Sequence, residues 1–289
     1  MIISSIKDVV KKILPKRVAS WIGHSIEYAK YFTNDVFDVV TGKSDPLVPP
    51  TRYMKNYTPT IEIFKKKGEE YFKYYIELGG LKPDDKVLDV GCGFGEKTIP
   101  LIKYLNENGR FEGIDIVKPG IDWCSKKITP NYPNFKFHLV DVYNKQYNPT
   151  GRYKPSEYRF PYEDNTFNFV NLVSVFTHMM PADIENYMKE IARVTKKNGK
   201  SMISYFILND ESIKLVETGK STQDFRYKFE GYRTTNPDMP EEAIGFPEED
   251  IRSIYAKNNL RIIDPIRFGS WCGRERFLNY QDIIIAEKT

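Results

Sequence analysis

Residues 86–95 read KVLDVGCGFG. The apolar run that ends at Val90 predicts a short buried strand, and three glycines follow it at alternate positions, Gly91, Gly93 and Gly95. Glycine lets the backbone turn sharply and approach a ligand where any side chain would intrude. A helical pattern comes next, and the first turn of a helix offers backbone N–H groups without intrahelical partners. The stretch therefore predicts a strand, a tight turn and a helix that together face a ligand.

Strand and helix patterns alternate on the C-terminal side of this turn. The expected strands are residues 86–90, 111–116, 135–140, 166–175, 200–207, 261–268 and 282–286, and the expected helices are residues 97–104, 120–128, 182–194 and 248–258. Strands separated by helices predict an α/β fold, a Rossmann-like, doubly wound and mainly parallel seven-stranded sheet. The last two strands have only a short connection, so we expect the last strand to be antiparallel.

The N-terminal segment has a different pattern. We expect residues 1–57 to form a helical extension and linker, and residues 58–289 to form the main domain. The first 22 residues predict a basic amphipathic helix, which suits peripheral contact with an anionic membrane surface or docking on its own domain. Two long insertions, residues 143–158 and 208–246, are expected to be irregular and to act as lids over a site.

The composition narrows the class of protein. A net charge of +4 over 289 residues gives no support to nucleic-acid binding. Three cysteines without a CxxC pair suggest neither a disulfide framework nor a zinc site. No stretch has the length and apolarity of a membrane span, and the start of the chain lacks the features of a signal peptide. We therefore expect a cytoplasmic protein, with the inner membrane surface as its alternative place.

Acidic residues indicate which ligand the glycine turn serves. A dinucleotide site would have a further glycine where this chain has Glu96, and that carboxylate would repel a pyrophosphate. Asp89, before the first glycine, suits a ligand that carries an ammonium group. Asp115 ends the second expected strand, 20 residues after Gly95, and Asp141 ends the third. Each acid could be a turn or cap residue by itself, but ligands of open α/β sheets bind along these strand ends.

At these positions the chain resembles the class I S-adenosylmethionine-dependent methyltransferase family, over roughly residues 60–289. The resemblance implies a Rossmann-like fold, methyltransferase activity and S-adenosyl-L-methionine as the cofactor. It implies that Asp115 binds the ribose, that Asp141 contacts the adenine, and that the segment after strand four borders the site of methyl transfer. The cofactor-binding residues implied are Asp89, Gly91, Cys92, Gly93, Gly95, Asp115, Ile116, Asp141, Val142, Val173 and Ser174.

A narrower resemblance concerns bacterial methyltransferases that accompany glycosyltransferases and other envelope or secondary-metabolite enzymes. It rests on residues 269–274, which read GSWCGR, and on residues 280–282, which read YQD. The loop that contains Trp271 and Arg274 is expected on the cofactor side, where these side chains would contact a sugar ring or an anionic group. The alternative is a hairpin whose tryptophan fills the core.

The acceptor side of the site is predicted from single residues. His178 follows the fourth strand and is the candidate general base, because histidine titrates near neutral pH; packing or capping of the next helix is the alternative. Tyr147 and Tyr153, in the first insertion, are candidate substrate contacts together with Trp271 and Arg274.

The expected reaction is O-methylation of a small molecule, a sugar or a lipid-linked glycan. Residues 173–176 read VSVF, whereas methyltransferases of bases and of glutamine in this family typically carry Asn or Asp followed by Pro-Pro there. An N-methyltransferase of a small amine, a cofactor-binding protein without activity and a dehydrogenase are the alternatives, and Glu96 weakens the last of them.

Overall fold

A computed structural model describes residues 29, 31–54, 58 and 60–289. The basic helix expected at the N-terminus, with its membrane contact at residues 1–22, lies outside the described residues. The chain divides into two compact units, Met1–Gly68 and Glu69–Thr289. In the first unit residues 31–40 are helical, and α3 spans Thr51–Met54. The buried Asp35 joins these two helices, because its carboxylate accepts hydrogen bonds from the Thr51 amide and the Arg52 guanidinium.

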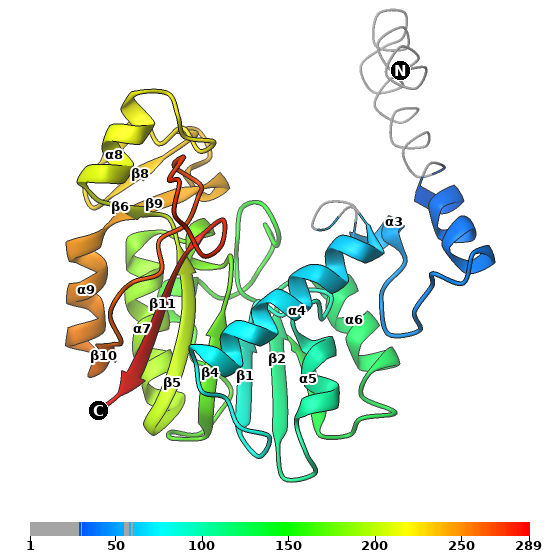
Figure 1. Ribbon diagram of the computed structural model, residues 1–289. Coiled ribbons are helices and arrows are strands. Elements are labelled where there is room, and N and C mark those ends of the chain that lie inside the picture. The colour runs from blue at the N-terminus through cyan, green and yellow to red at the C-terminus, as the bar shows by residue number, and fades with distance from the viewer. Residues whose placement is uncertain (1–28, 30, 55–57, 59) are drawn as a thin grey trace, which may run out of the picture. The chain divides into compact units, whose positions relative to one another are not determined.

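The main sheet has seven strands in the order β10-β11-β5-β4-β1-β2-β3. Their bounds are β1 Lys86–Val90, β2 Arg110–Asp115, β3 Phe135–Leu139, β4 Phe167–Leu172, β5 Thr195–Tyr205, β10 Leu260–Ile262 and β11 Asp282–Lys288. Strands β3, β2, β1, β4 and β5 pair in parallel, and β11 pairs antiparallel with both β5 and β10. The expected mainly parallel α/β sheet with an antiparallel last strand is confirmed (Figure 1).

Helices flank these strands in the chain. Their bounds are α4 Ile61–Glu77, α5 Thr98–Tyr104, α6 Lys118–Lys127, α7 Pro181–Val194 and α9 Glu248–Lys257. Helices α5, α6 and α7 connect parallel strands, whereas α4 precedes β1 and α9 precedes β10. In α7, Ile184, Met188 and Ile191 recur at helical spacing and are almost fully buried in the core of the sheet. Each such side chain contributes about 1.5–3 kcal/mol by leaving water. The helix begins at Pro181, whose fixed φ suits a first helical position.

The insertion at residues 208–246 contains regular structure, contrary to the expectation of an irregular segment. A second sheet has the order β6-β9-β8-β7, with bounds β6 Ile207–Leu208, β9 Ile244–Pro247, β8 Tyr232–Thr234 and β7 Tyr227–Phe229. Helix α8, Asp210–Glu217, follows β6 and is capped by Asn209, whose side chain accepts a hydrogen bond from the Ser212 amide. Figure 1 shows this sheet and α8 beside the end of the main sheet at which β5 finishes. Pairing satisfies backbone groups that a buried irregular loop would leave unpaired.

The strand expected at residues 261–268 is shorter in the structure, because β10 ends at Ile262. Pro265 has no backbone N–H and therefore cannot donate to a sheet ladder. The chain returns to β11 only at the isolated bridge between Arg267 and Ile283. The other insertion, residues 143–158, is mostly irregular and includes the short helix η1, Pro155–Glu157.

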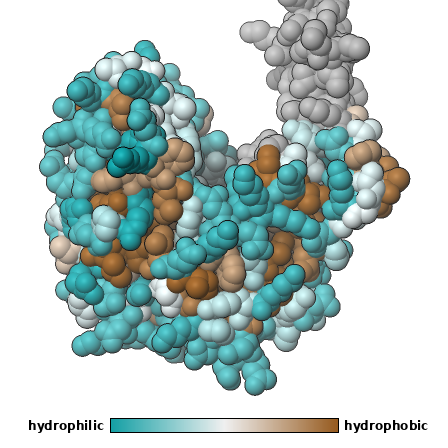
Figure 2. Space-filling model, viewed as in Figure 1, coloured by the Kyte–Doolittle hydropathy of each residue, from teal (hydrophilic) through white to brown (hydrophobic). Residues whose placement is uncertain are grey.

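The outer surface is mixed in character. Hydrophilic residues cover most of the face drawn in Figure 2, and hydrophobic residues appear between them in patches. Within the described ranges, no helix combines the length and the apolarity needed to cross a membrane.

Candidate functional site

The glycine turn lies between the ends of β1 and β2. Gly91, Gly93 and Gly95 all have positive φ, at 81°, 54° and 81°. A Cβ at Gly91 would lie 2.3 Å from the Val175 side chain, whereas a Cβ at Gly93 would meet nothing within 4 Å. Gly91 is therefore required by packing, and Gly93 leaves open space at the turn, as a closely approaching ligand needs.

Cys92, between these glycines, points into the protein. Its side chain is 1% exposed, and its Sγ lies 2.8 Å from where a Cβ of Gly113 would be. Burial raises the pKa of the Cys92 thiol well above its ordinary value, so the thiol stays protonated. Only the backbone of Cys92 is placed to contact a ligand.

Asp89 is buried and only half satisfied. It lies opposite Asn171 in the parallel pair of β1 and β4, and the Asn171 amide donates to Asp89 Oδ1 over 2.6 Å. Asp89 Oδ2 and Asn171 Oδ1 are both buried without a hydrogen-bond partner in the described part of the chain. Burial raises the pKa of the Asp89 carboxyl, and the nearby Lys97 ammonium and the Asn171 amide oppose this shift. Two neighbouring oxygens without donors are unusual and indicate a missing ligand or water.

Asn171 is absent from the site expected from the sequence. Its signal is a polar residue inside the apolar run FVNLV at residues 169–173. The register that places it beside Asp89 is a property of the sheet, which the sequence of one strand does not contain.

Asp115 holds the glycine turn. Its carboxylate accepts hydrogen bonds from the Gly93 amide over 2.7 Å and from the Val117 amide over 2.7 Å. Burial raises the pKa of the Asp115 carboxyl, the two amides oppose this, and the charge of nearby Asp89 adds to it. Asp89 and Asp115 are thus close enough to interact. Ile116, the next residue, is half-buried against the core.

Asp141 lies just after β3, and its carboxylate accepts a hydrogen bond from a residue nearby in the chain. It is exposed, and its Oδ1 accepts a hydrogen bond from the Arg152 amide in the 143–158 insertion over 3.2 Å. Val142 is buried and bridges to Tyr153. The structure brings Asp89 and Asp115 together, and it places Asp141 along the same strand ends beside the base of the insertion.

Ser174 has a strained backbone after β4. Its φ of 57° is left-handed, which is uncommon for a residue other than glycine and is found at functional sites. Its amide donates to Ser204 Oγ, and both serine hydroxyls donate to Gln281 Oε1, over 2.9 Å from Ser174 and 2.7 Å from Ser204. These contacts join the ends of β4 and β5 to the start of β11. Val173, just before, is 7% exposed.

His178 lies in the short helix η2, Phe176–His178, and is half-buried. Its Nδ1 lies 2.9 Å from the carbonyl oxygen of Glu241, which can only accept. Nδ1 therefore carries the hydrogen, and the neutral ring keeps its lone pair on Nε2. Burial lowers the pKa of His178, and the backbone of Glu241 and Glu242 partly opposes this, so the ring is neutral at pH 7.

The two insertions meet at His178. The Tyr147 ring lies edge-on to the histidine ring at a centroid distance of 5.7 Å, and the Asn144 amide donates to the His178 carbonyl. Lys145 donates to the Asp238 carbonyl in the other insertion. Burial raises the pKa of Tyr147, and the negative charge of Asp115 raises it further, which places this ring near the glycine turn as well. Tyr153 is 44% exposed and packs on Tyr158 instead.

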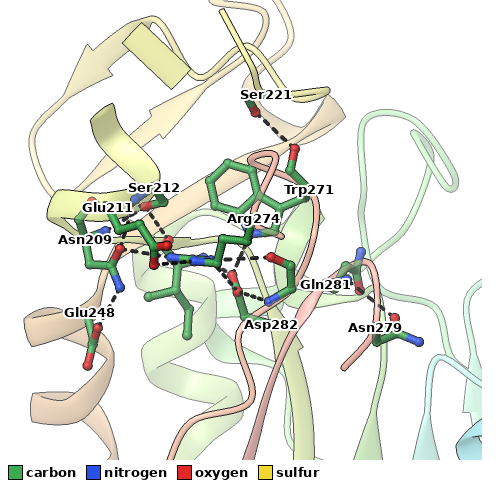
Figure 3. A network of polar contacts seen from close by, with 12 residues as sticks. Asn209, Glu211, Ser212, Ser221, Glu248, Trp271, Arg274, Asn279, Gln281 and Asp282 are labelled. Carbon is green, nitrogen blue, oxygen red and sulfur yellow. Dashed lines mark hydrogen bonds and ion pairs between the residues drawn. The ribbon is translucent and has the colours of Figure 1, made fainter. Parts of the chain in front are cut away.

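Trp271 and Arg274 have structural roles. Trp271 is fully buried and packs edge-on against Phe206 and Phe225, which corresponds to the alternative in which the tryptophan fills the core. Its Nε1 donates to Asp282 Oδ2 over 2.7 Å. Arg274 is 6% exposed and bonds to other residues of the same network (Figure 3). Neither side chain offers a surface to an acceptor, contrary to the expectation for this loop.

Asp282 is the centre of that network. Its Oδ1 accepts from the Gly269 amide over 2.6 Å and from Arg274 over 3.2 Å, and its Oδ2 accepts from the Ile207 amide over 2.6 Å as well as from Trp271. Burial raises the pKa of Asp282 to about 6, against these hydrogen bonds. In Figure 3, Arg274 lies between Asp282 and two residues at the start of α8, Glu211 and the capping residue Asn209. The network joins β11 to the second sheet.

Comparison with known proteins identifies the family to which the chain belongs. Residues 81–236 match the family model described as a methyltransferase domain. The chain is 23% identical over 239 residues to the demethylmenaquinone methyltransferase of Bacillus mycoides, covering 78% of this chain and 89% of that protein. It is 24% identical over 131 residues to the 2-phytyl-1,4-naphtoquinone methyltransferase of Trichormus variabilis, covering 45% and 51%.

Solved structures share the fold. The PH0226 protein of Pyrococcus horikoshii aligns with a TM-score of 0.54 at 15% identity, covering 81% of this chain and 95% of that one. A methyltransferase from Aquifex aeolicus aligns with a TM-score of 0.50 at 19% identity, covering 85% and 100%. Together with the match of the family model over more than half of the chain, these findings show that the protein belongs to the methyltransferase-domain family and is a class I S-adenosylmethionine-dependent methyltransferase.

Proposed function

We propose that S-adenosyl-L-methionine binds along the ends of β1, β2 and β4, where the residues present fit it. The unpaired Oδ2 of the buried Asp89 needs a donor, and the ammonium group of the cofactor supplies one. The open space at Gly93 admits close approach to the backbone. Asp115 keeps lone pairs for ribose hydroxyls after accepting its two amide hydrogens. The cofactor, when bound, supplies a methyl group on a sulfonium centre.

We assign the remaining expected cofactor contacts by their position. Ile116 and Val142 flank the adenine side, with Asp141 as the polar contact there. Val173 and Ser174 border the reacting end, and the strain at Ser174 supports a role that packing does not explain. These assignments rest on placement along the same strand ends.

The reaction that the site supports best is O-methylation of a small hydroxylated acceptor, with His178 as the general base. The observation that carries this proposal is the fixed form of the His178 ring, neutral and with its proton on Nδ1. Its Nε2 can then take the proton of an acceptor hydroxyl. Tyr147 and the Glu241 segment contact this ring from the two insertions, and the acceptor is proposed to bind beside it.

The acceptor is proposed to be a small molecule, a sugar or a lipid-linked glycan. The two relatives named above are named as methyltransferases of demethylmenaquinone and of 2-phytyl-1,4-naphtoquinone. A reduced quinone carries ring hydroxyls and can be tested as a hydroxylated small molecule. A quinol is therefore included in the proposed class. N-methylation of a small amine is the second candidate, favoured by the same neutral base, because an ammonium acceptor must also lose a proton.

The test is formation of S-adenosylhomocysteine with three probes: a reduced naphthoquinone, a nucleotide sugar and a primary amine. Turnover with either hydroxylated probe is expected, with the low-pH midpoint of kcat/KM below 6.5, because burial lowers the pKa of His178 and the base acts when neutral. The His178→Asn variant should lose about 10²–10⁴-fold in kcat and keep its affinity for S-adenosylhomocysteine.

The control is His138→Asn, which removes the other described histidine, paired with Glu112 at 2.7 Å. It should leave kcat unchanged. Turnover with the amine alone would favour N-methylation, and product binding without turnover on any probe would favour a cofactor-binding protein. Equal losses of kcat and of cofactor affinity in His178→Asn would reject this residue as the base.

A further inference from the structure

Gln281, the residue before β11, has its side-chain amide fixed at one end. Its Oε1 accepts hydrogen bonds from the hydroxyl groups of Ser174 and Ser204, over 2.9 and 2.7 Å. Ser204 Oγ also accepts a hydrogen bond from the Ser174 amide, which leaves its one hydrogen to be donated to Gln281. Two donors on one oxygen set the orientation of the amide, with Oε1 toward the ends of β4 and β5 and Nε2 away from them.

The other end of this amide is available to a ligand. Nε2 carries two hydrogens, and within the described ranges neither is donated to a protein acceptor. Gln281 is 8% exposed, and its Nε2 is not one of the buried polar atoms that lack a partner, unlike Asp89 Oδ2. Nε2 therefore reaches the space outside the strand ends. Because the side chain is already ordered, a ligand oxygen can bind there without a further loss of side-chain entropy.

Gln281 faces the same side of the main sheet as Asp89 and Asn171. Asn171 pairs with Asp89 on β1 and with Met202 on β5, and paired residues of adjacent strands point to one face. Ser204 is two residues after Met202 and so shares that face, and its hydroxyl contacts Gln281. In the sheet order β11-β5-β4-β1-β2, Gln281 is two strands from β4 and three from β1, about 10 and 14 Å at the usual strand spacing. It thus lies beyond the proposed cofactor contacts, on the side of the reacting end.

The neighbours of Gln281 anchor it to two further elements. The Asn279 amide donates a hydrogen bond to the Glu70 carboxylate in α4 over 2.8 Å. The Tyr280 hydroxyl lies 3.0 Å from Thr222 Oγ1 in the second insertion. These three consecutive residues thus contact α4, the second insertion and the ends of β4 and β5 in turn. Such support keeps the glutamine amide at a fixed position, as a binding group requires.

We propose that Gln281 binds the methyl acceptor, with Nε2 donating hydrogen bonds to an acceptor oxygen other than the one that His178 deprotonates. This inference rests on the proposed function and adds a second point of contact to it. An amide N–H group needs a lone pair, so the acceptor carries at least two oxygens, as a sugar or a reduced quinone does. A primary amine without oxygen lacks this contact, and Gln281 therefore favours the hydroxylated acceptors.

The test compares two substitutions that remove the donor in different ways. Gln281→Glu keeps Oε1 for both serine hydroxyls and replaces Nε2 by an oxygen that repels the acceptor's lone pairs, whereas Gln281→Met removes both ends of the amide. The KM of the acceptor is measured with the reduced naphthoquinone and with the nucleotide sugar. It should rise about 3- to 10-fold in Gln281→Met, the range for one neutral hydrogen bond, and at least about 10-fold in Gln281→Glu. Binding lost equally in the ground state and the transition state leaves kcat unchanged. Affinity for S-adenosylhomocysteine by calorimetry should stay within about twofold in both variants.

The order of the two variants separates binding from a structural role. If Gln281 only joined the strand ends through Oε1, Gln281→Glu would be the milder change, because it keeps both serine contacts. An acceptor KM that is unchanged in Gln281→Glu, or an affinity for S-adenosylhomocysteine that falls by the same factor, would overturn the proposal. The control Gln223→Glu changes an exposed amide that donates to Tyr280, and it should alter neither quantity. If the unaltered protein binds S-adenosylhomocysteine but methylates neither hydroxylated probe, the proposed function is wrong, and this inference fails with it.

Discussion

At the residue scale, a position in the glycine turn can require glycine for two reasons. The backbone can have a positive φ, or a neighbouring group can leave no room for a Cβ. Both reasons apply to Gly91, because its φ is positive and a Cβ would collide with Val175. For Gly93 only the backbone reason applies within the protein, since nothing lies within 4 Å of where its Cβ would be. The open space at Gly93 therefore serves something that binds there, and a single methyl group can test it.

We expect Gly93→Ala to fold and to lose cofactor affinity. The left-handed backbone costs alanine about 1–2 kcal/mol, which urea unfolding measures. The added methyl group would occupy the path of the ligand, so affinity for S-adenosylhomocysteine should fall at least about tenfold by calorimetry. Gly219→Ala is the matched control, because Gly219 also has a positive φ, of 74°, and an open Cβ position in the second insertion. Similar affinities in the two variants would show that no ligand passes close to Gly93.

At the scale of elements, β11 joins the two sheets through its first residue. The two oxygens of Asp282 each accept two hydrogen bonds, from β6, from the loop before β11, from Trp271 and from Arg274. An amide nitrogen cannot accept, so asparagine at this position would leave two of the four donors unsatisfied, and it would remove the buried negative charge beside Arg274. The loss of stability is expected to be like that caused by removing one partner of a buried ion pair.

Asp282→Asn should lower the free energy of unfolding by about 3–5 kcal/mol in urea titrations. Hydrogen exchange in β6 and β9 should rise more than in β1, because the network ties the second sheet to the first. Asp224→Asn provides the control, since Asp224 forms an exposed ion pair with Arg226 in the same insertion and should contribute about 0–1 kcal/mol. A change within about 1 kcal/mol for Asp282→Asn would mean that the network contributes little.

The elements also show what the sequence can and cannot reveal. The bounds of β1 are as expected, because an apolar run and a glycine turn are local features. The second sheet is not visible in the sequence: β6 has two residues, and β7 and β8 have three each, which is too short for a periodic pattern. Trp271 has a glycine two residues away on each side, which is typical of a loop, and only its packing on Phe206 and Phe225 in the folded chain shows that it is buried.

At the scale of the whole molecule, the proposed cofactor contacts come from the middle of the main sheet. Asp115 ends β2, and Asp89 and Asn171 are the next-to-last residues of β1 and β4, and these three strands are adjacent in the sheet. These strands are central, so they are expected to open only when the sheet unfolds. A ligand held by all of them binds the folded state and not the unfolded chain. Its binding energy should therefore add to global stability.

Thermal unfolding tests this coupling. At a concentration of about 100 times its dissociation constant, S-adenosylhomocysteine should add about 2.7 kcal/mol, which raises Tm by about 5–10 °C for a chain of this size. NAD at the same concentration should leave Tm unchanged, because the carboxylates of Glu96 and Asp89 at the glycine turn would repel its pyrophosphate. A shift with NAD and none with S-adenosylhomocysteine would reverse the cofactor assignment. A ligand that binds by calorimetry without raising Tm would have to bind the unfolded chain about as well as the folded one. A site made by β1, β2 and β4 together does not exist in the unfolded chain, so that result would reject the proposed site.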